Sequence, residues 1–417
     1  MTRPDLGRVE FTALLAMSMA LAALGLDLML PAFTAMRADL GLPADSTALA
    51  GVVTAYLLGL AAGQLLYGPL ADRFGRRPTL FVGFGIYALG ALLSTLSPGL
   101  SLLLAGRFVW GLGAAGPRVV TLAVVRDRFE GEQMARAMSF IMAVFIIVPV
   151  IAPTLGAAVI QVASWRVLFV LCLLAAVVMT VWARRLPETL PPQHRLELSL
   201  GRIVATARLV VTNRQTAGYT IALTSLYGVF TSYLASSEII FGSTFGRPDA
   251  FPIIFGGVAA TMGLAMLGNT RLVSRLGTRR TSHLVLLAYV GVAAVLVLLA
   301  VLTEGRPPLA LFLPVLAAIL VGHALLIPNF NTIAMAPMAA HAGTAASVIG
   351  AVQLAVGAGL GALLDRRFDG TILPLSWGFL GYGVLALVVV LVVERGVLFR
   401  PMMDPVSRRR PGPAREA

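Results

Sequence analysis

The chain alternates long apolar runs with short polar connections. A helix that crosses the hydrocarbon core of a membrane needs about 20 mostly apolar residues. The runs that reach this length cover about residues 11–35, 47–70, 78–97, 100–125, 135–160, 165–186, 216–242, 251–273, 281–303, 308–333, 342–364 and 372–394. They predict an all-α integral membrane protein with twelve transmembrane helices.

The longest polar connection follows the sixth of these runs. It holds Pro187, Pro191 and Pro192, and then an amphipathic stretch around residues 196–211. Dividing the chain there predicts two six-helix pseudo-repeats. The predicted parts are an N-terminal half over residues 1–186, a cytoplasmic central loop over 187–214, a C-terminal half over 215–394 and an Arg-rich cytoplasmic tail over 395–417.

A short charged turn separates the second and third apolar runs. Its glycine, proline and arginine residues are Gly68, Pro69, Arg73, Gly75, Arg76 and Arg77. Glycine and proline favour a tight turn, and arginine is costly in hydrocarbon, so the turn is expected at a membrane face. A weaker copy, Arg275–Arg280, lies at the corresponding place in the second half. A signature that recurs in two halves indicates a duplicated membrane unit.

The basic residues predict the orientation in the membrane, and all 32 of them are arginine. With the N-terminus in the cytoplasm, 24 arginines fall in cytoplasmic segments, including Arg408–Arg410 of the tail, and 6 fall on the opposite face. Positively charged loops stay on the inner side of a membrane. We therefore expect a multi-pass membrane protein with both termini in the cytoplasm.

Composition narrows the class of protein. The 417 residues are 58% hydrophobic and 12% charged, whereas a soluble domain averages roughly 25% charged residues. The net charge of +13 comes from arginines between apolar runs, which favours a topology signal over nucleic-acid binding. The single Cys172 and the four histidines show no metal-ligand spacing. No phosphate loop or nucleophile motif is present, so we expect neither ATP hydrolysis nor another enzymatic activity.

Several stretches resemble the drug:proton antiporters of the major facilitator superfamily, in particular the bicyclomycin, chloramphenicol and florfenicol efflux proteins. The matching stretches are Asp27–Pro31, Gly68–Leu80, Arg107, Gly111–Ala115, Ala152–Gly156, Ser164–Arg166 and Leu186–Leu190. The match covers nearly the whole chain and is stronger before residue 190 than after it. It implies the twelve-helix transporter fold, a place in a bacterial inner membrane, small amphipathic substrates, no cofactor, and a proton gradient as the energy source.

Charged residues within the apolar runs are the strongest pointers to function. Each costs at least roughly 2.5–3.5 kcal/mol at a helix centre unless it is paired or hydrated. They are Asp27 in the first run, Arg107 and Arg118 in the fourth, and Glu238 near the outer end of the seventh. Asp27 and Arg107 both lie roughly 12 Å below the outer surface at about 1.5 Å per residue. An intermittent ion pair between them is therefore feasible.

Asp27 is the expected proton carrier. Burial favours a neutral carboxyl group and a nearby guanidinium favours a charged one, so a group between these influences can switch as a cavity opens to either side. The alternative is a static buried pair. Glu238 is expected to be a second protonation site, a contact for a substrate cation, or a hydrated gate residue at the outer end.

Other polar and aromatic side chains are candidates for a central substrate cavity. Arg118 lies about 20° from the helix face of Arg107, and it either lines a wet cavity or extends to the cytoplasmic surface. Trp110 stands where the resembled family usually has Gln, and it offers an aromatic surface to a ligand or to lipid. The remaining candidates are Tyr56, Tyr233, Asn331 and Gln353.

The resemblance gives the charged turn a role as a cytoplasmic gate. In the family, the residue that matches Asp72 docks at the start of helix eleven, here near Gly343 and Thr344. Unpaired N–H groups and the helix dipole stabilise a carboxylate at such a place. The arginines of the turn are expected to meet Asp127 or Glu130 on the neighbouring loop. The alternative is that these charges only set the topology.

Three residues of the fifth run, Pro149, Pro153 and Gly156, predict a bent or weakened helix. We interpret the whole sequence as a monomeric, proton-coupled exporter of small amphipathic molecules that works by alternating access and contacts membrane lipid. An uptake symporter for a small metabolite and a receptor or scaffold without transport activity are the alternatives.

Overall fold

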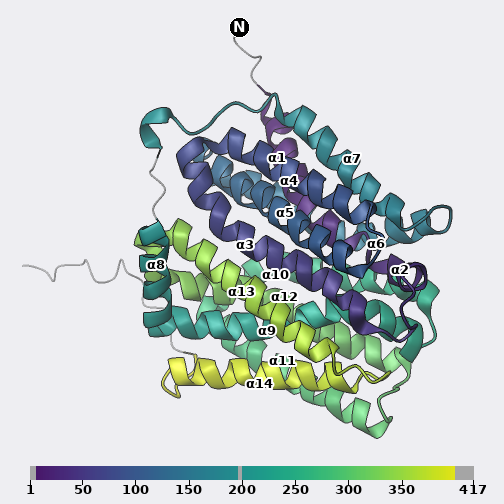
Figure 1. Cartoon of the computed structure of the whole chain (residues 1–417). Coiled ribbons are helices and arrows are strands. Elements are labelled where there is room, and N and C mark those ends of the chain that lie inside the picture. Colours follow the sequence, from purple (N-terminus) through teal and green to yellow (C-terminus); the bar gives the residue numbers. More distant parts are fainter. Residues whose placement is uncertain (1–5, 196–199, 400–417) are drawn as a thin grey trace, which may run out of the picture.

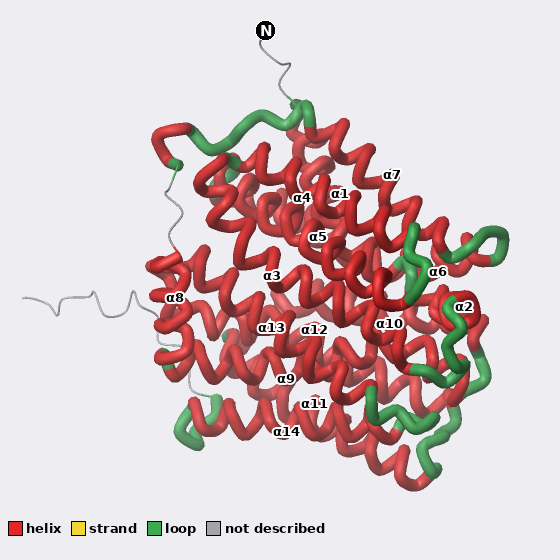
Figure 2. Tube along the Cα trace, viewed as in Figure 1, coloured by secondary structure: helices red, strands yellow, loops and turns green. Residues whose placement is uncertain are grey.

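The computed structural model describes residues 6–195 and 200–399, so the predicted tail motif Arg408–Arg410 lies outside it. The described chain is helical and has no strand (Figures 1 and 2). The N-terminal group of helices comprises α1 (Arg8–Asp27), α2 (Phe33–Asp39), α3 (Ala50–Phe74), α4 (Arg76–Thr95), α5 (Leu100–Arg128), α6 (Gly131–Ile160) and α7 (Arg166–Ala183). After α8 (Leu200–Thr212), the C-terminal group comprises α9 (Arg214–Ile239), α10 (Phe251–Leu276), α11 (Thr278–Leu302), α12 (Leu309–Met335), α13 (Ala342–Asp365) and α14 (Leu373–Val393).

The lengths and composition of these helices fit a membrane. Ten segments of the described chain are long and apolar enough to cross one, and a single segment, Leu309–Asp365, contains both α12 and α13. The further long helix, α9, carries eight serine and threonine residues, and most of its side chains are buried among its neighbours. Burial suits such a helix, because hydrocarbon offers hydroxyl groups no partner. The prediction of a twelve-helix membrane protein is confirmed.

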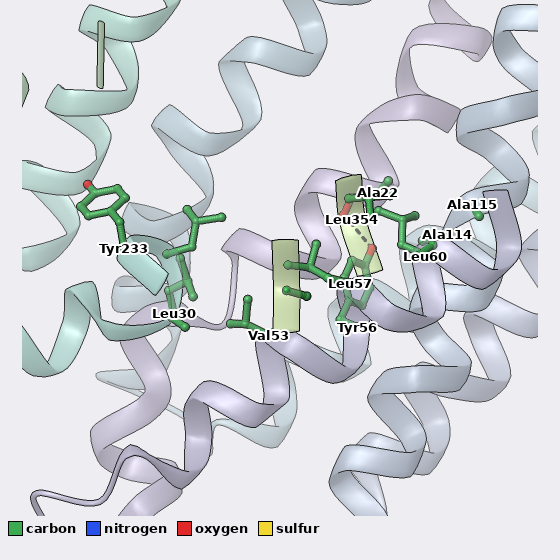
Figure 3. Close-up of a cluster of buried hydrophobic side chains, with 14 of the residues drawn as sticks. Ala22, Leu30, Val53, Tyr56, Leu57, Leu60, Ala114, Ala115, Tyr233 and Leu354 are labelled. Atoms are coloured by element: carbon green, nitrogen blue, oxygen red, sulfur yellow. Dashed lines mark hydrogen bonds between the residues drawn. The ribbon is translucent and has the colours of Figure 1, made fainter. Parts of the chain in front are cut away.

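The two groups of helices meet mainly along two pairs of neighbours. Within the N-terminal group α5 packs between α3 and α4, and within the C-terminal group α9 packs against α12, α13 and α14. Across the boundary α3 lies beside α13 (Figure 1), and α6 contacts α10. The hydrophobic core continues through this boundary, where Tyr233 and Leu354 lie close to Leu30, Val53 and Leu57 (Figure 3).

The sequence predicted that the first apolar run forms one helix, but the structure divides it into two. α1 ends at Asp27, a 3₁₀ turn covers Leu30–Ala32, and α2 begins at Phe33. Pro31 explains the interruption, because proline has no N–H group to donate to the preceding turn and its ring clashes there. Asp27 is thus the last residue of a helix rather than a residue in the middle of one.

The charged turn is shorter than predicted. α3 continues through Gly68 and Pro69 as far as Phe74, and the chain changes direction at Gly75, whose φ of +102° favours glycine. Gly277, with φ of +81°, makes the same connection between α10 and α11. The recurrence seen in the sequence therefore corresponds to a shared backbone geometry.

Candidate functional site

The break in the first helix lies directly against α6. A Cβ atom added to Gly156 would lie 2.1 Å from the carbonyl oxygen of Leu28, so only glycine permits this crossing. α6 itself runs without interruption from Gly131 to Ile160, through both Pro149 and Pro153. The helix that was predicted to be bent or weakened by these prolines is therefore continuous. Its glycine instead makes room for the gap between α1 and α2.

Arg107 is bound to the end of α1. Its Nη1 donates to the carbonyl oxygen of Gly25 at 2.8 Å. Its guanidinium carbon lies 4.4 Å from the ring centre of Tyr56 and 4.7 Å from that of Trp110, within the range of cation–π attraction. The last carbonyl groups of a helix lack amide partners and favour a cation nearby. The predicted ion pair between Arg107 and Asp27 is not formed, because the guanidinium is held by this backbone and these rings.

Tyr56 and Trp110, together with Arg107, form what we call the α1 clamp. Both aromatic side chains are fully buried. The hydroxyl of Tyr56 donates to the carbonyl oxygen of Ala22 at 2.7 Å (Figure 3), and Trp110 packs edge-on against Tyr87 with ring centres 5.4 Å apart. The prediction that Tyr56 and Trp110 line an open cavity, or that Trp110 faces lipid, is wrong. They hold the end of α1 in place.

Asp27 is buried, with 4% of its surface exposed, and makes no hydrogen bond or ion pair to a described residue. It lies near Arg118 on α5 and the hydroxyl of Tyr227 on α9. Arg118 is half-buried and likewise has no such bond within the described chain. Asp27, Arg118 and Tyr227, here called the central site, therefore bring an acid and a base without a fixed partner together between the two groups of helices.

The other cavity candidates differ in their exposure. Tyr233 is buried and stacks on Phe255 with ring centres 5.8 Å apart. Gln353 is half-buried on α13, and Asn331 is exposed on α12. No hydrogen bond joins any of the three to the central site among the described residues. One turn after Tyr227, the ring of Phe230 stacks on that of the buried His323, with ring centres 4.5 Å apart. This pair places aromatic side chains of the C-terminal group next to the central site.

A buried ion pair closes the predicted outer end. Nη2 of Arg37 lies 2.7 Å from Oε2 of Glu238, and each side chain is 7% exposed. The hydroxyl of Thr34 donates to the other carboxylate oxygen. Thr34 and Arg37 belong to α2 and Glu238 to α9, so this outer latch ties the two groups of helices together. Glu238 is buried by its partners rather than hydrated as predicted.

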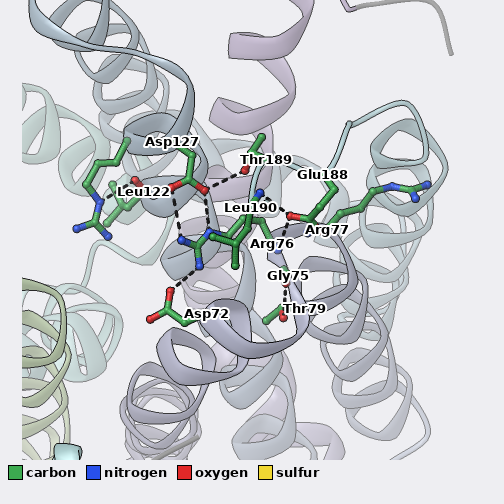
Figure 4. Close-up of polar contacts among 11 residues, drawn as sticks. Asp72, Gly75, Arg76, Arg77, Thr79, Leu122, Asp127, Glu188, Thr189 and Leu190 are labelled. Atoms are coloured by element: carbon green, nitrogen blue, oxygen red, sulfur yellow. Dashed lines mark hydrogen bonds and ion pairs between the residues drawn. The ribbon is translucent and has the colours of Figure 1, made fainter. Parts of the chain in front are cut away.

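A cluster of charges occupies the opposite end, around the turn between α3 and α4 (Figure 4). Arg76 pairs with Asp72 at 2.6 Å and with Asp127 at 2.8 Å. Asp127 also accepts a hydrogen bond from the hydroxyl of Thr189 at 3.0 Å. The expected contact between the turn and Asp127 is therefore made by Arg76.

The other two arginines of the turn have different surroundings. Arg73 lies over the ring of Phe74, 5.7 Å from its centre. Arg77 donates to the carbonyl oxygen of Arg184 at 3.1 Å and lies over the ring of Phe81. No ion pair joins Arg73 to an acid in the part of the chain that the structure describes. The prediction that all three arginines meet acids of the next loop is wrong for Arg73.

Asp72 is not docked on α13 in this structure. Its side chain is 45% exposed and pairs with Arg76. Gly343 and Thr344, the predicted docking point, lie with Asp72 on the walls of a groove of about 480 Å³. Both groups of helices line the groove, with Asp72, Arg76, Arg126 and Asp127 from one and His341, Gly343, Thr344 and Ser347 from the other. This end of the molecule is hollowed while the outer end is latched.

Glu188 caps the N-terminus of α4. Its carboxylate accepts hydrogen bonds from the backbone N–H groups of Arg76 at 2.9 Å and Arg77 at 3.1 Å (Figure 4). The first N–H groups of a helix have no partner within the helix. A Cβ atom at Gly75 would lie 2.5 Å from Oε2 of Glu188, so the glycine also makes room for the cap. The Leu186–Leu190 motif thus fixes the charged turn.

Replacing Glu188 with Ala should lower the free energy of unfolding by about 1 kcal/mol, as the loss of a helix cap does. The melting temperature of the purified protein in detergent measures this change. Glu132→Ala is the matched control, because Glu132 makes an exposed pair with Arg136 and has an 88% exposed side chain. Such surface pairs contribute little. Equal melting temperatures for the wild type and Glu188→Ala would contradict the capping role.

Sequence reasoning missed Arg37 and Glu188 as functional residues. Arg37 and Glu238 carry opposite charges near the outer ends of two apolar runs, and their equal depth was a usable signal for a pair. Glu188 was visible only as part of a motif. Its partners are backbone N–H groups, which leave no mark of their own in a sequence.

Comparisons with known proteins agree with this architecture. The model of the Major Facilitator Superfamily matches residues 15–362. The bicyclomycin resistance protein homolog of Haemophilus influenzae is 30% identical over 354 residues, which cover 84% of this chain and 87% of that protein. Multidrug resistance protein MdtL of Shigella flexneri is 29% identical over 339 residues, 79% of this chain and 82% of that protein. The crystal structure of a D-xylose-proton symporter shares the fold, with a TM-score of 0.77 at 13% identity over 94% of this chain and 99% of that one. The chain is a multi-pass membrane protein and belongs to the major facilitator superfamily of transporters.

Proposed function

We propose that the protein exports small amphipathic molecules, including drugs, in exchange for protons. The observation that carries this proposal is the central site, where a buried carboxyl group without a fixed partner lies between the two groups of helices. Relatives named for resistance to bicyclomycin and to multiple drugs support export over uptake. The proton gradient is the energy source, and the proposed activity requires neither a cofactor nor an enzymatic reaction.

The two ends of the molecule support alternating access. With the outer latch closed, the groove at the other end is the route by which a substrate reaches the central site. Arg118 and Tyr227 supply hydrogen-bond donors for a polar group of the substrate, and the surrounding apolar side chains hold the rest of it. Opening the latch lets the substrate leave and lets Asp27 take up a proton. The α1 clamp keeps Asp27 in position, so Arg107 acts as a positioning residue.

The proposed setting is the inner membrane of a bacterium, with the groove and both chain termini on the cytoplasmic side. The arginine-rich turn between α3 and α4 lies at the groove end (Figure 4), and positively charged loops favour the inner side. A single chain contributes the groove, the latch and the central site, so we propose that the monomer is the transporting unit and that lipid surrounds it.

Adding chloramphenicol to energised inverted membrane vesicles that contain the protein should partly collapse their pH gradient. An exchanger moves the drug into such vesicles and protons out, which the recovery of a quenched pH-sensitive dye reports. Vesicles without the protein are the control. Proton-dependent accumulation of the compound by intact cells would show an uptake symporter instead. If no compound of a broad drug panel changes the gradient or accumulates, the protein is not a transporter of this kind.

A further inference from the structure

A second buried acid lies at the outer end of the C-terminal group. Asp365 is the last residue of α13, and 4% of its surface is exposed. Ser232 of α9 donates a hydrogen bond to its Oδ1 at 2.5 Å. Its Oδ2 is buried and has no hydrogen-bond partner. The proposed export mechanism makes no use of this carboxyl group.

No positive charge compensates Asp365 within the described chain, where it takes part in no ion pair. The charged and titratable groups toward this end of the surrounding elements are Arg366 and Arg367 on its own helix end, Asp369 in the next loop, Tyr227, Tyr233 and Glu238 on α9, and Tyr382 on α14. Arg366, Arg367 and Asp369 are exposed, and Glu238 is held by Arg37. The hydroxyl of Tyr382 donates to the carbonyl oxygen of Leu360 at 3.2 Å instead.

The place of Asp365 at the C-terminus of α13 makes a negative charge on it still less favourable. The C-terminus of a helix carries partial negative charge and disfavours an anion. A buried carboxylate with one oxygen unpaired is far less favourable than a neutral carboxyl group in the same place. With a proton on Oδ2, the oxygen Oδ1 still accepts the hydrogen bond from Ser232, so the observed contact is compatible with the neutral form.

We propose that Asp365 is a second proton-binding site, which holds its proton while the outer latch is closed and releases it when the outer end opens. Ser232 precedes Glu238 by six residues on α9, or about 9 Å along the helix. Breaking the latch therefore admits water close to Asp365, and hydration stabilises the carboxylate. The proposal concerns proton binding by the protein itself, so its test does not require transport.

Infrared spectroscopy of the purified protein tests the proposal, because a protonated carboxyl group absorbs at a frequency separate from that of a carboxylate. At neutral pH, Asp365→Asn should remove one carboxylic-acid band of the wild type. The exposed acid Asp369, four residues further along, is the matched control, and Asp369→Asn should remove none. Ser232→Ala keeps the acid but removes its hydrogen bond, and should shift the same band to higher frequency.

The dependence on the latch is tested in the same way. Arg37→Ala, which removes the partner of Glu238, should weaken the band of Asp365, identified as the band that Arg37→Ala combined with Asp365→Asn lacks. If Asp365→Asn removes no band and Ser232→Ala shifts none, Asp365 is ionised and the proposal is overturned. A band that keeps its full intensity in Arg37→Ala overturns the link to the latch. These spectra do not depend on drug transport, so the proposal on Asp365 and the proposed export function can each be overturned without the other.

Discussion

Asp27→Asn should abolish proton-driven export while leaving substrate binding intact. The amide nearly keeps the shape of the carboxyl group but cannot exchange a proton. The α1 clamp contacts the backbone of Gly25 and Ala22 rather than the side chain of Asp27, so the end of α1 should stay in place. We expect export against a gradient to fall to the rate of passive leak in proteoliposomes. Binding of substrate to the purified variant should persist and lose its dependence on pH.

The matched control for this experiment is Asp45→Asn. Asp45 is an exposed acid in the connection before α3. Its replacement should leave both the rate of export and the pH dependence of binding unchanged. If Asp27→Asn still exports substrate against a gradient, the coupling site lies elsewhere, and the buried acids Glu238 and Asp365 at the outer end become the candidates.

Arg37→Ala should shift the protein strongly toward a state with an open outer end. The substitution leaves the carboxylate of Glu238 buried without its cation, and removing one partner of a buried pair costs about 3–5 kcal/mol. Separation of α2 from α9 exposes Glu238 to water and relieves this penalty without unfolding. A penalty of this size changes the balance of the two states by about a hundredfold or more. Distances between spin labels on the outer ends of α2 and α9 would measure the opening.

Two further variants make the latch experiment specific. Arg37→Glu combined with Glu238→Arg recreates an ion pair and should restore part of the closed population. Arg166→Ala breaks a partly exposed pair between Arg166 and Asp39, which joins α7 to α2 within the N-terminal group. This control should leave the label distances nearly unchanged, because exposed pairs contribute little. Unchanged distances in Arg37→Ala itself would show that the pair does not hold the outer end closed.

Hydropathy predicted the helices because a membrane imposes both their length and their apolar composition. It did not predict the break after Asp27, since proline is common in membrane helices and an apolar run continues through Pro31. Counting residues along a helix also gave the depth of a side chain in the membrane, but it did not show which neighbouring group that side chain contacts. Arg107 lies level with the end of α1 and binds a backbone carbonyl there, and no side-chain pattern marks a carbonyl group as a partner.

The contacts of the charged turn show a different limit. Asp72 has two possible partners, Arg76 four residues along the helix and the start of α13 across a groove. Which one it takes depends on the relative position of the two groups of helices, and a moving protein offers both. Trp110 illustrates a third limit, because its large ring could be assigned to a ligand, to lipid or to the core until its neighbours were known.

The cap formed by Glu188 has a consequence for dividing the chain. The segment that leaves α7 does not run free from residue 187 onward, because Glu188 holds the start of α4 and Thr189 holds Asp127. These residues belong structurally to the N-terminal group. A fragment that ends at residue 186 would lose both contacts, whereas one that ends after Leu190 would keep them. Co-expressed fragments, permuted chains and hybrids that exchange halves with a relative are therefore best joined beyond Leu190.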